Sequence, residues 1–332
     1  MNRLLTFLTT ELRPVFPESS KIFLKIGNLE ITWYAVIILS GAIICALFGY
    51  FHYCKRLGVD ADTVSEGLAI GLLCGILGAR LYYVAFSGYH YESFWEVINP
   101  REGGLAIHGA VIATMIFIPI FCKIKNIDLI TTLEIALPIF MFGQVVGRWG
   151  NFMNQEAFGS LIKYPGFVSN EIPLDDNALM AQREFLKSLL IPDFIIDRMY
   201  IDYSSAAGFT VAGYYHPTFL YESLLNLFGM TTYMIVRKFW KKILVGDGVS
   251  FYLIWYGIVR IFIESLRTDP LLLGNTNIKV AWVISGIFIL VGIALAVIRR
   301  ICKFRMESCY DALYKEGATM MLNNKQEETL VE

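Results

Sequence analysis

Seven long apolar stretches limit what this 332-residue chain can fold into. A helix needs roughly 20 predominantly apolar residues to cross a lipid bilayer. The stretches lie at about residues 31–53, 64–86, 105–122, 131–150, 217–240, 249–266 and 280–301. Hydrophobic residues make up 56% of the chain and charged residues only 17%, which is typical of a membrane protein rather than a soluble one. We therefore predict an all-α polytopic membrane protein with seven transmembrane helices.

Clusters of lysine and arginine predict how these helices are oriented. Loops rich in these residues remain on the cytoplasmic side of a membrane. The clusters follow the first, third, fifth and seventh stretches, at residues 55–56, 123–125, 237–242 and 299–305. All four fall on one side of a seven-helix arrangement, so we expect the N-terminus outside and the C-terminus in the cytoplasm.

The segment between the fourth and fifth stretches is too long for a simple connection, and such loops are often functional. We predict that residues 151–216 form a small extracytoplasmic head, with a helix at 178–190 and an extended segment at 209–215. Residues 1–30 are predicted to form an extracytoplasmic or interfacial segment, and residues 31–302 the seven-helix transmembrane domain. Residues 303–332 are predicted to be a cytoplasmic tail, polar and mobile from residue 313 onward.

Net charge and cysteine spacing argue against two kinds of site. The formal net charge is −1, so bulk charge favours no nucleic-acid partner. The six cysteines lack the paired spacing of zinc ligands, and we predict no metal site. The predicted topology places every cysteine in the membrane or on its cytoplasmic side, where a disulfide framework is not expected.

One polar stretch stands at the outer end of the fourth apolar segment. Residues 147–159 read GRWGNFMNQEAFG and contain one arginine, two asparagines, one glutamate and three glycines. An apolar helix has no structural need for such a cluster, because polar groups near hydrocarbon are costly and usually mark function. Closely spaced glycines also allow a ligand or another backbone to approach closely. We therefore expect a functional site here.

The predicted helices bring further polar residues to the same depth. At 1.5 Å per residue, His108 lies roughly 6 Å inside the outer surface. Tyr256, Arg260 and Glu264 are spaced by four residues and share one helical face. The outer half of the bilayer thus collects Tyr34, Arg80, His108, Arg148, Asn151, Glu222, Tyr256, Arg260 and Glu264, whereas Glu66 and Glu134 lie near the inner side. Clustering at one leaflet predicts a lipid headgroup as the ligand, because an ion pathway would use the full thickness.

Each residue also has an ordinary structural interpretation. Arg148 could anchor a helix end at the membrane surface. His108 alone is more often a buried, hydrogen-bonded histidine than a catalyst, and Arg260 with Glu264 could be an intrahelical ion pair. The hypothesis of a site therefore depends on the convergence of these residues and not on any single one.

The same residues carry a resemblance to a known family, the bacterial phosphatidylglycerol–prolipoprotein diacylglyceryl transferases. The polar stretch agrees with the family signature at Gly147, Arg148, Gly150, Asn151, Phe152, Asn154, Glu156 and Gly159. Further matches are Trp33–Tyr34, the Gly-Ala-Arg-Leu run ending at Leu81, Ile-His-Gly at Ile107, HPTFLYES from His216 and YGIVRIFIESLR from Tyr256. They follow the same order along some 230 residues. Ala110 and Ala35 replace common glycines, and the external insertion and C-terminal tail are long, which affects the substrate cap rather than the reaction.

The resemblance implies a seven-helix fold with an external head, in the bacterial inner membrane. It implies transfer of the diacylglyceryl group of phosphatidylglycerol to a prolipoprotein cysteine, with release of glycerol-1-phosphate and no cofactor. The essential residues carried over are His108, Arg148, Asn151, Gly159, Tyr256 and Arg260. Tyr34, Glu156 and Glu264 carry over as polar partners, and Arg80 and Glu134 match family positions, of which we place Arg80 among the substrate-binding residues.

This reaction requires a held phosphate and an activated thiol. Arginine offers a rigid fork of donors for phosphate oxygens, and we assign Arg148 and Arg260 to that task, with Asn151 adding a hydrogen bond. A free thiol is mostly protonated near neutrality, so a base such as His108 would help. Activation by Arg260 or Tyr256 is an open alternative.

The expected partners are phosphatidylglycerol, other membrane lipids and signal peptides that carry a lipobox cysteine. The lipid would enter sideways from the bilayer, and the external segment would clamp the peptide. A lipid transporter or flippase is the competing function, because it could use the same buried charges as a pathway. Such a transporter would show broken helices in paired halves of the chain, and the sequence shows no such repeat.

Overall fold

The computed structural model describes residues 12–27, 29–89, 91, 93–98, 104–163, 174–202, 211–267, 272–273, 276 and 278–322. The chain divides into two compact units. Unit 1 comprises Met1–Ile43, Phe140–Thr232 and Ser250–Ala296, and unit 2 comprises Ile44–Ile139, Tyr233–Val249 and Val297–Glu332.

Long helices form where the apolar stretches predict them, with ends that differ by a few residues. They are α2 (Trp33–Gly49), α3 (Ala61–Phe86), α5 (Ile107–Ile124), α6 (Leu129–Asn154), α9 (Thr218–Phe239), α10 (Asp247–Leu266) and α11 (Val280–Ile301). A π-helical turn η2 (Tyr50–Cys54) extends α2. Among the described residues, five helices are long and apolar enough to cross a membrane, which are α2 with η2, α3, α6, α10 and α11.

The two remaining long helices explain why seven spans stay a prediction. The apolar helix α5 is shorter, and α9 has 22 residues but carries Glu222, Arg237 and Lys238. The five long apolar helices, with few strands beside them, show a mostly helical, multi-pass membrane protein.

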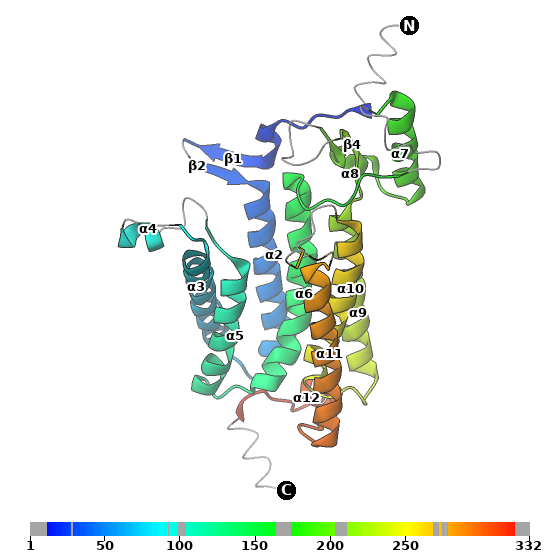
Figure 1. The fold of residues 1–332 in the computed structure, drawn as a ribbon. Coiled ribbons are helices and arrows are strands. Elements are labelled where there is room, and N and C mark those ends of the chain that lie inside the picture. Colours follow the sequence, from blue (N-terminus) through cyan, green and yellow to red (C-terminus); the bar gives the residue numbers. More distant parts are fainter. Residues whose placement is uncertain are drawn as a thin grey trace, which may run out of the picture. The chain divides into compact units, whose positions relative to one another are not determined.

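Small side chains allow the helices of unit 1 to approach one another. A Cβ on Gly257 of α10 would lie 2.8 Å from the carbonyl oxygen of Ser285 in α11. The hydroxyl of Ser223 in α9 donates to the carbonyl of Val145 in α6 over 3.2 Å. Glycine at such contacts is typical of membrane helices, whose association depends on close packing and interhelical hydrogen bonds. Figure 1 shows these four helices side by side.

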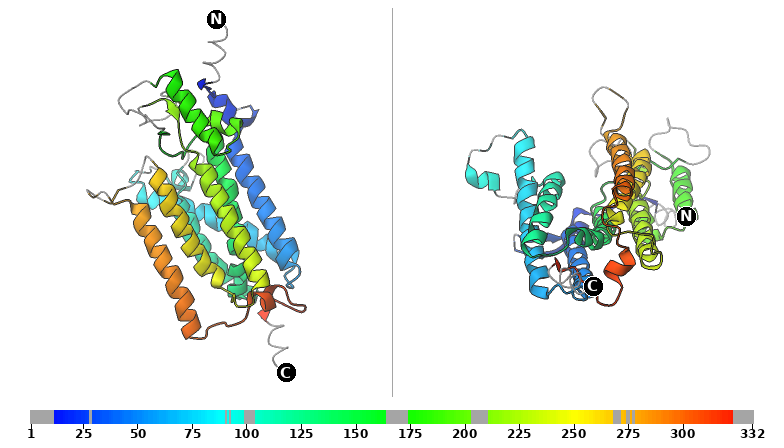
Figure 2. Two further views of the ribbon diagram at one scale, coloured as in Figure 1. Left: turned by 90° about the vertical axis from the view of Figure 1, so that its right-hand side faces the viewer. Right: turned by 90° about the horizontal axis from the view of Figure 1, so that it is seen from below.

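At one end of the unit 1 helices lies a small subdomain that contains the only strands in the described part of the chain (Figure 2, left). Its elements are η1 (Glu18–Lys21), β1 (Ile22–Ile26), β2 (Leu29–Thr32), α7 (Asp176–Ser188), α8 (Asp193–Arg198), β3 (Tyr200–Ile201) and β4 (Gly213–Tyr214). The antiparallel pairs β1–β2 and β3–β4 are two-stranded sheets, so the fold is mostly rather than entirely helical.

The subdomain has a core of its own. The predicted helix at 178–190 is confirmed as α7, and the Asp175 side chain caps it by accepting from the Ala178 N–H at 2.7 Å. Leu179 and Leu186 of α7 and Ile196 of α8 are fully buried in this core. The predicted extended segment is confirmed where it is described, at β4.

In unit 2, α3 packs closely against α5 through a row of glycines. Gly67, Gly71, Gly75 and Gly78 recur at helical spacing on α3 and face α5. A Cβ on Gly78 would lie 2.6 Å from the carbonyl oxygen of Gly109, the residue after His108. The close approach of these backbones therefore depends on the absence of a side chain at Gly78.

A buried charge network occupies the same unit. The carboxylate of Glu134 in α6 is fully buried and accepts from the backbone N–H groups of Gly246 and Gly248, at 2.8 and 3.0 Å. The guanidinium of Arg237, also fully buried, lies 3.3 Å from this carboxylate and donates to the Tyr53 hydroxyl. Arg237 belongs to the clusters that predicted the orientation, so this cation also has a structural role.

The expectation of a mobile tail from residue 313 is wrong for residues 313–322. The helix α12 (Cys309–Leu313) buries Leu313, and Met320 is buried as well. The Met320 carbonyl accepts from Asp128, and its N–H donates to the Leu57 carbonyl. The pattern of side chains along the sequence does not indicate backbone hydrogen bonds of this kind, which explains the error.

All six cysteines are free thiols. In the described part of the chain, no group of three or more histidine, cysteine or acidic side chains comes together as a metal site would require.

Candidate functional site

The polar stretch 147–159 forms the end of α6 and the turn that follows it in unit 1. The helix ends at Asn154 because Gln155 and Ala157 adopt the left-handed conformation, with φ of 53° and 56°. The N–H of Glu156 donates back to the carbonyl of Asn151 over 3.1 Å. This turn returns the Glu156 side chain to the last turn of α6.

Arg148 forms an ion pair with a carboxylate from a different helix. Its Nη2 lies 2.6 Å from Oε1 of Glu222 in α9. The Glu222 side chain is 4% exposed and the Arg148 side chain 25% exposed. The buried carboxylate thus fixes one edge of the guanidinium and leaves other donors accessible, since arginine has five.

Two asparagines and Glu156 extend this network. The Oδ1 atom of Asn151 lies 3.5 Å from Nη1 of Arg148, and its Nδ2 lies 3.5 Å from Oε1 of Glu156. Asn154 donates to the same Glu156 oxygen over 2.9 Å. Four polar residues of the signature stretch are therefore joined in one hydrogen-bonded group.

The second predicted cation repeats the arrangement on α10. Nη2 of Arg260 lies 2.9 Å from Oε2 of Glu264, one turn further along the helix. The Glu264 side chain is 3% exposed and that of Arg260 is 21% exposed. The structure thus confirms the intrahelical ion pair that was the ordinary interpretation, and again leaves a part-exposed guanidinium on a buried carboxylate.

A hydrogen bond between α6 and α10 places the two clusters on neighbouring helices. Nε2 of Gln144 donates to the Tyr252 hydroxyl over 3.0 Å, and the Tyr252 ring stacks on Tyr256 with centroids 5.7 Å apart. Arg148 and Tyr256 each lie one helical turn beyond this bond. Among the described residues, no hydrogen bond or ion pair joins the Arg148 and Arg260 groups directly.

Tyr34 and Gly159 contact the ends of these helices. A Cβ on Gly150 of α6 would lie 2.7 Å from the Tyr34 ring, so this glycine makes room for the tyrosine. A Cβ on Gly159 would lie 3.0 Å from the carbonyl oxygen of Leu266, the last residue of α10. Gly159 therefore brings the turn after α6 to the end of α10, which is a packing role.

His108 lies in unit 2, at the second position of α5. Its side chain is exposed, and its ring stacks on Tyr82 of α3 with centroids 5.7 Å apart and an interplanar angle of 28°. The ordinary interpretation of a buried histidine is therefore wrong, and the imidazole is accessible to a ligand.

Arg80 is buried in unit 2, and its donors bind backbone carbonyls. It donates to Val97 over 2.7 Å, to Gly104 over 3.0 Å and also to Glu96. These carbonyls belong to α4 (Phe94–Ile98) and to the segment just before α5. The contacts indicate that Arg80 holds this segment, and its assignment to substrate binding stays a prediction.

Glu222 is the residue that the sequence-based assignment of site residues missed. It occurs in the HPTFLYES run, in the predicted outer half of a span, where an unpaired carboxylate would be costly. The sequence therefore offered one signal for Glu222, because a carboxylate in a membrane span requires a cationic partner. Only the packing of α9 against α6 identifies the partner as Arg148.

Comparison with known proteins shows the family of this chain. A family model described as prolipoprotein diacylglyceryl transferase matches residues 21–298. This chain belongs to the prolipoprotein diacylglyceryl transferase family. The matched region contains every residue assigned to the site from the sequence.

Individual relatives in the family are similar over most of their length. The chain is 36% identical over 285 residues to the phosphatidylglycerol–prolipoprotein diacylglyceryl transferase of Bacillus cytotoxicus, which covers 86% of this chain and 93% of the relative. It is 37% identical, with the same coverage, to the proteins of that name from Lysinibacillus sphaericus and Bacillus cereus. The match ends at residue 298, so the packed C-terminal segment lies beyond the family model.

Proposed function

We propose that this chain transfers the sn-1,2-diacylglyceryl group of phosphatidylglycerol to the thiol of a lipobox cysteine in prolipoproteins. Membership of the family is the observation that carries the proposal. The two part-exposed arginines on buried carboxylates supply the chemistry that an anionic lipid requires. We place the protein in a bacterial inner membrane with seven spans, its N-terminus outside and its C-terminus in the cytoplasm.

The reaction is a displacement at a glycerol carbon. The cysteine sulfur forms a bond to the sn-3 carbon of the diacylglyceryl group, and the bond from that carbon to the phosphate oxygen breaks. A base accepts the thiol proton, and glycerol-1-phosphate departs with the electron pair of the broken carbon–oxygen bond. The product is a thioether, and all atoms and electrons of the reaction are accounted for without a metal or organic cofactor.

Arg148 and Arg260 are the proposed phosphate ligands. Glu222 and Glu264 each hold one edge of a guanidinium, so that the remaining donors are oriented before the lipid arrives. Fixed cations of this kind stabilise the charge that grows on the departing phosphate. Asn151 bonds to Arg148 and is close enough to add a donor to the same phosphate.

His108 is the proposed base for the thiol, because its ring is exposed and histidine exchanges protons near neutral pH. The alternative is that Arg260 or Tyr256 activates the thiol through charge or a hydrogen bond. The subdomain with α7 and α8 is proposed as the extracytoplasmic head that holds the signal peptide.

The test is a transfer assay with purified protein, phosphatidylglycerol and a lipobox peptide. Thioether formation is read from the mass of the peptide, and glycerol-1-phosphate is measured separately. We expect Arg148→Ala and Arg260→Ala each to lower the rate by about 100-fold or more, the usual cost of losing a donor to transition-state charge. Arg148→Lys should recover part of the rate because the charge remains.

Arg13→Ala is the matched control, because Arg13 forms an exposed ion pair with Asp176 in the subdomain. Full activity in both the Arg148 and Arg260 variants would remove their phosphate role. A protein that moves phosphatidylglycerol across vesicles without forming a thioether would favour the transporter instead.

A further inference from the structure

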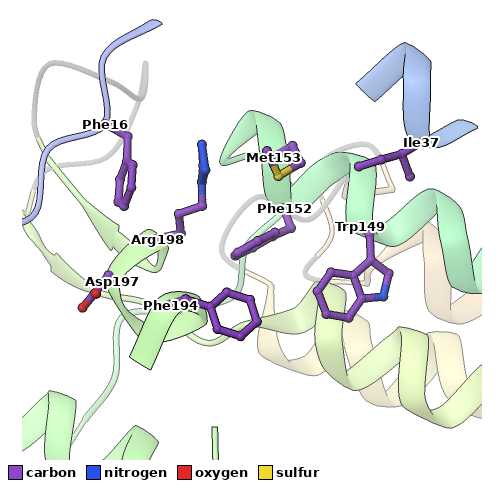
Figure 3. Close-up of a pocket in the computed structure, with 8 residues that line it drawn as sticks. All are labelled: Phe16, Ile37, Trp149, Phe152, Met153, Phe194, Asp197 and Arg198. Carbon is purple, nitrogen blue, oxygen red and sulfur yellow. The ribbon is translucent and has the colours of Figure 1, made fainter. Parts of the chain in front are cut away.

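An aromatic cavity of about 510 Å³ lies in unit 1 beside the signature stretch. Figure 3 shows its lining, in which the side chain of Arg198 lies between the rings of Phe16 and Phe152, and the rings of Phe194 and Trp149 continue the aromatic wall. Roughly 300–1,000 Å³ is the usual range for a site that binds a small molecule. The cavity therefore has the size and the mainly apolar lining of a ligand site.

This cavity is separate from the Arg148 group. Trp149, Phe152 and Met153 line it from α6, whereas Arg148 and Asn151 lie on another face of the same helix. At 3.6 residues per turn, the centres of these two faces are about 120° apart. The two sites can therefore be occupied independently.

Arg198 in α8 brings a buried positive charge to the cavity. Its exposed fraction is 9%. The guanidinium carbon lies 4.6 Å from the centre of the Phe16 ring and 5.7 Å from that of Phe152, and Nη2 donates to the Ser20 hydroxyl over 3.2 Å. Its Nε atom has no hydrogen-bond partner, and no carboxylate forms an ion pair with it, in the part of the chain that the structure describes.

The one acidic residue in the lining does not neutralise this charge. Asp197 forms an ion pair with Arg183, which also pairs with Asp193 at 3.0 Å. Burial lowers the pKa of Arg198, as expected when a cation leaves water without an opposing charge. An uncompensated buried cation is costly, so the cavity favours a ligand that brings an anion.

We propose that this cavity binds an anionic phospholipid that does not itself react, with its phosphate on Arg198 and an acyl chain against the aromatic rings. The lining residues Ile37 and Trp149 belong to helices that are candidate membrane spans, so lipid has direct access. A hydrophobic peptide segment would fill the apolar space but bring no anion to Arg198. The proposal goes beyond the transfer reaction and does not depend on it.

The test is photolabelling of the full-length protein in phosphatidylcholine nanodiscs. The probe is phosphatidylglycerol with a diazirine in one acyl chain, and a matched phosphatidylcholine probe serves as the neutral-lipid comparison. Labelled peptides are mapped by mass spectrometry. We expect adducts on residues 149–153 and 194–198, at least about five-fold more with phosphatidylglycerol than with phosphatidylcholine.

Variants of Arg198 and competing unlabelled ligands test whether the charge of Arg198 binds the lipid. Arg198→Gln should reduce these adducts about five-fold or more, Arg198→Lys should retain most of them, and Arg148→Ala should leave them unchanged. If Arg198→Gln does not fold, competition on the unmodified protein gives the answer, because unlabelled phosphatidylglycerol should displace the probe and free glycerol-1-phosphate should not.

Three results would overturn the proposal: equal labelling by the two probes, adducts that persist in Arg198→Gln, or displacement of the probe by a lipobox peptide. The last result would assign the cavity to the protein substrate. Because the readout needs no turnover, loss of transfer activity with intact labelling would contradict only the proposed function.

Discussion

Replacing Gly78 by alanine should separate the two helices that position His108. A Cβ at Gly78 would lie 2.6 Å from the Gly109 carbonyl oxygen, and still closer to the Ala113 Cβ. Ordinary van der Waals contact begins at 3.4 Å and the Ala113 Cβ is the nearer obstacle, so the backbones must move apart by about 1.0 Å. Neither obstacle is the end of a flexible side chain, which prevents a cheaper adjustment.

Two opposing terms set the size of the effect. Overpacking typically costs about 1–3 kcal/mol, and these rigid obstacles favour the upper part of that range. Alanine in place of glycine inside a helix recovers about 1 kcal/mol. The net loss is about 1–2 kcal/mol, or roughly 5–30-fold in the unfolding equilibrium. The temperature of unfolding should fall by roughly 2–8 °C.

The assay is thermal unfolding in detergent micelles, with transfer activity measured in parallel. Gly75→Ala is the matched control on the same helix, because its Cβ would meet only the Thr114 hydroxyl at 3.8 Å. That variant should be neutral or slightly stabilised. Activity should fall in Gly78→Ala alone, since Gly109 follows His108. Equal stability of the two variants would refute the reasoning about close approach.

Three further predictions concern the buried charges, the subdomain and the C-terminal segment. Glu134→Ala should cost about 3–5 kcal/mol of stability, measured by thermal unfolding, because it leaves the buried charge of Arg237 without an opposing carboxylate. Burial lowers the pKa of His216, so the folded protein favours the neutral imidazole. The stability that the neutral ring provides is fully present above about pH 6.5 and is lost as the pH falls. Unfolding at pH 5 and pH 7.5 should differ less in His216→Gln than in the unmodified protein, and an equal difference would contradict this. Leu313→Ala should cost about 2–5 kcal/mol, whereas Leu190→Ala, at a 91% exposed position, should not change stability.

The length and apolar content of the seven stretches predicted the helices of this protein with good accuracy. The stretch at 280–301 matches α11 at both ends, and the others differ by a few residues. Length and apolar content dominate in a bilayer, because each helix must satisfy its own backbone there. The two small sheets were not predicted. The strands β3 and β4 have only two residues each and depend on contacts from outside the segment. The strands β1 and β2, of five and four residues, lie mostly within residues 1–30, for which only an extracytoplasmic or interfacial segment was predicted.

The sequence also predicted which residues belong to the candidate site, but not which residues they contact. Arg148 and Arg260 stood out because charges in apolar helices are rare, and the spacing of Arg260 and Glu264 predicted their ion pair. Arg80 looked similar, yet its donors bind the carbonyls of Val97 and Gly104. A residue type does not reveal whether a backbone carbonyl or a ligand receives its hydrogen bonds.

The amino-acid sequence by itself determined the membrane-spanning class of this protein and the approximate positions of its helices, and it predicted the residues that we propose as phosphate ligands. These properties depend on composition and on local spacing. The tertiary structure alone decided that Glu222 pairs with Arg148, that Arg198 lies in an aromatic cavity and that residues 309–322 pack onto unit 2. Each of these contacts joins residues far apart along the chain, and their proximity arises only when the helices pack.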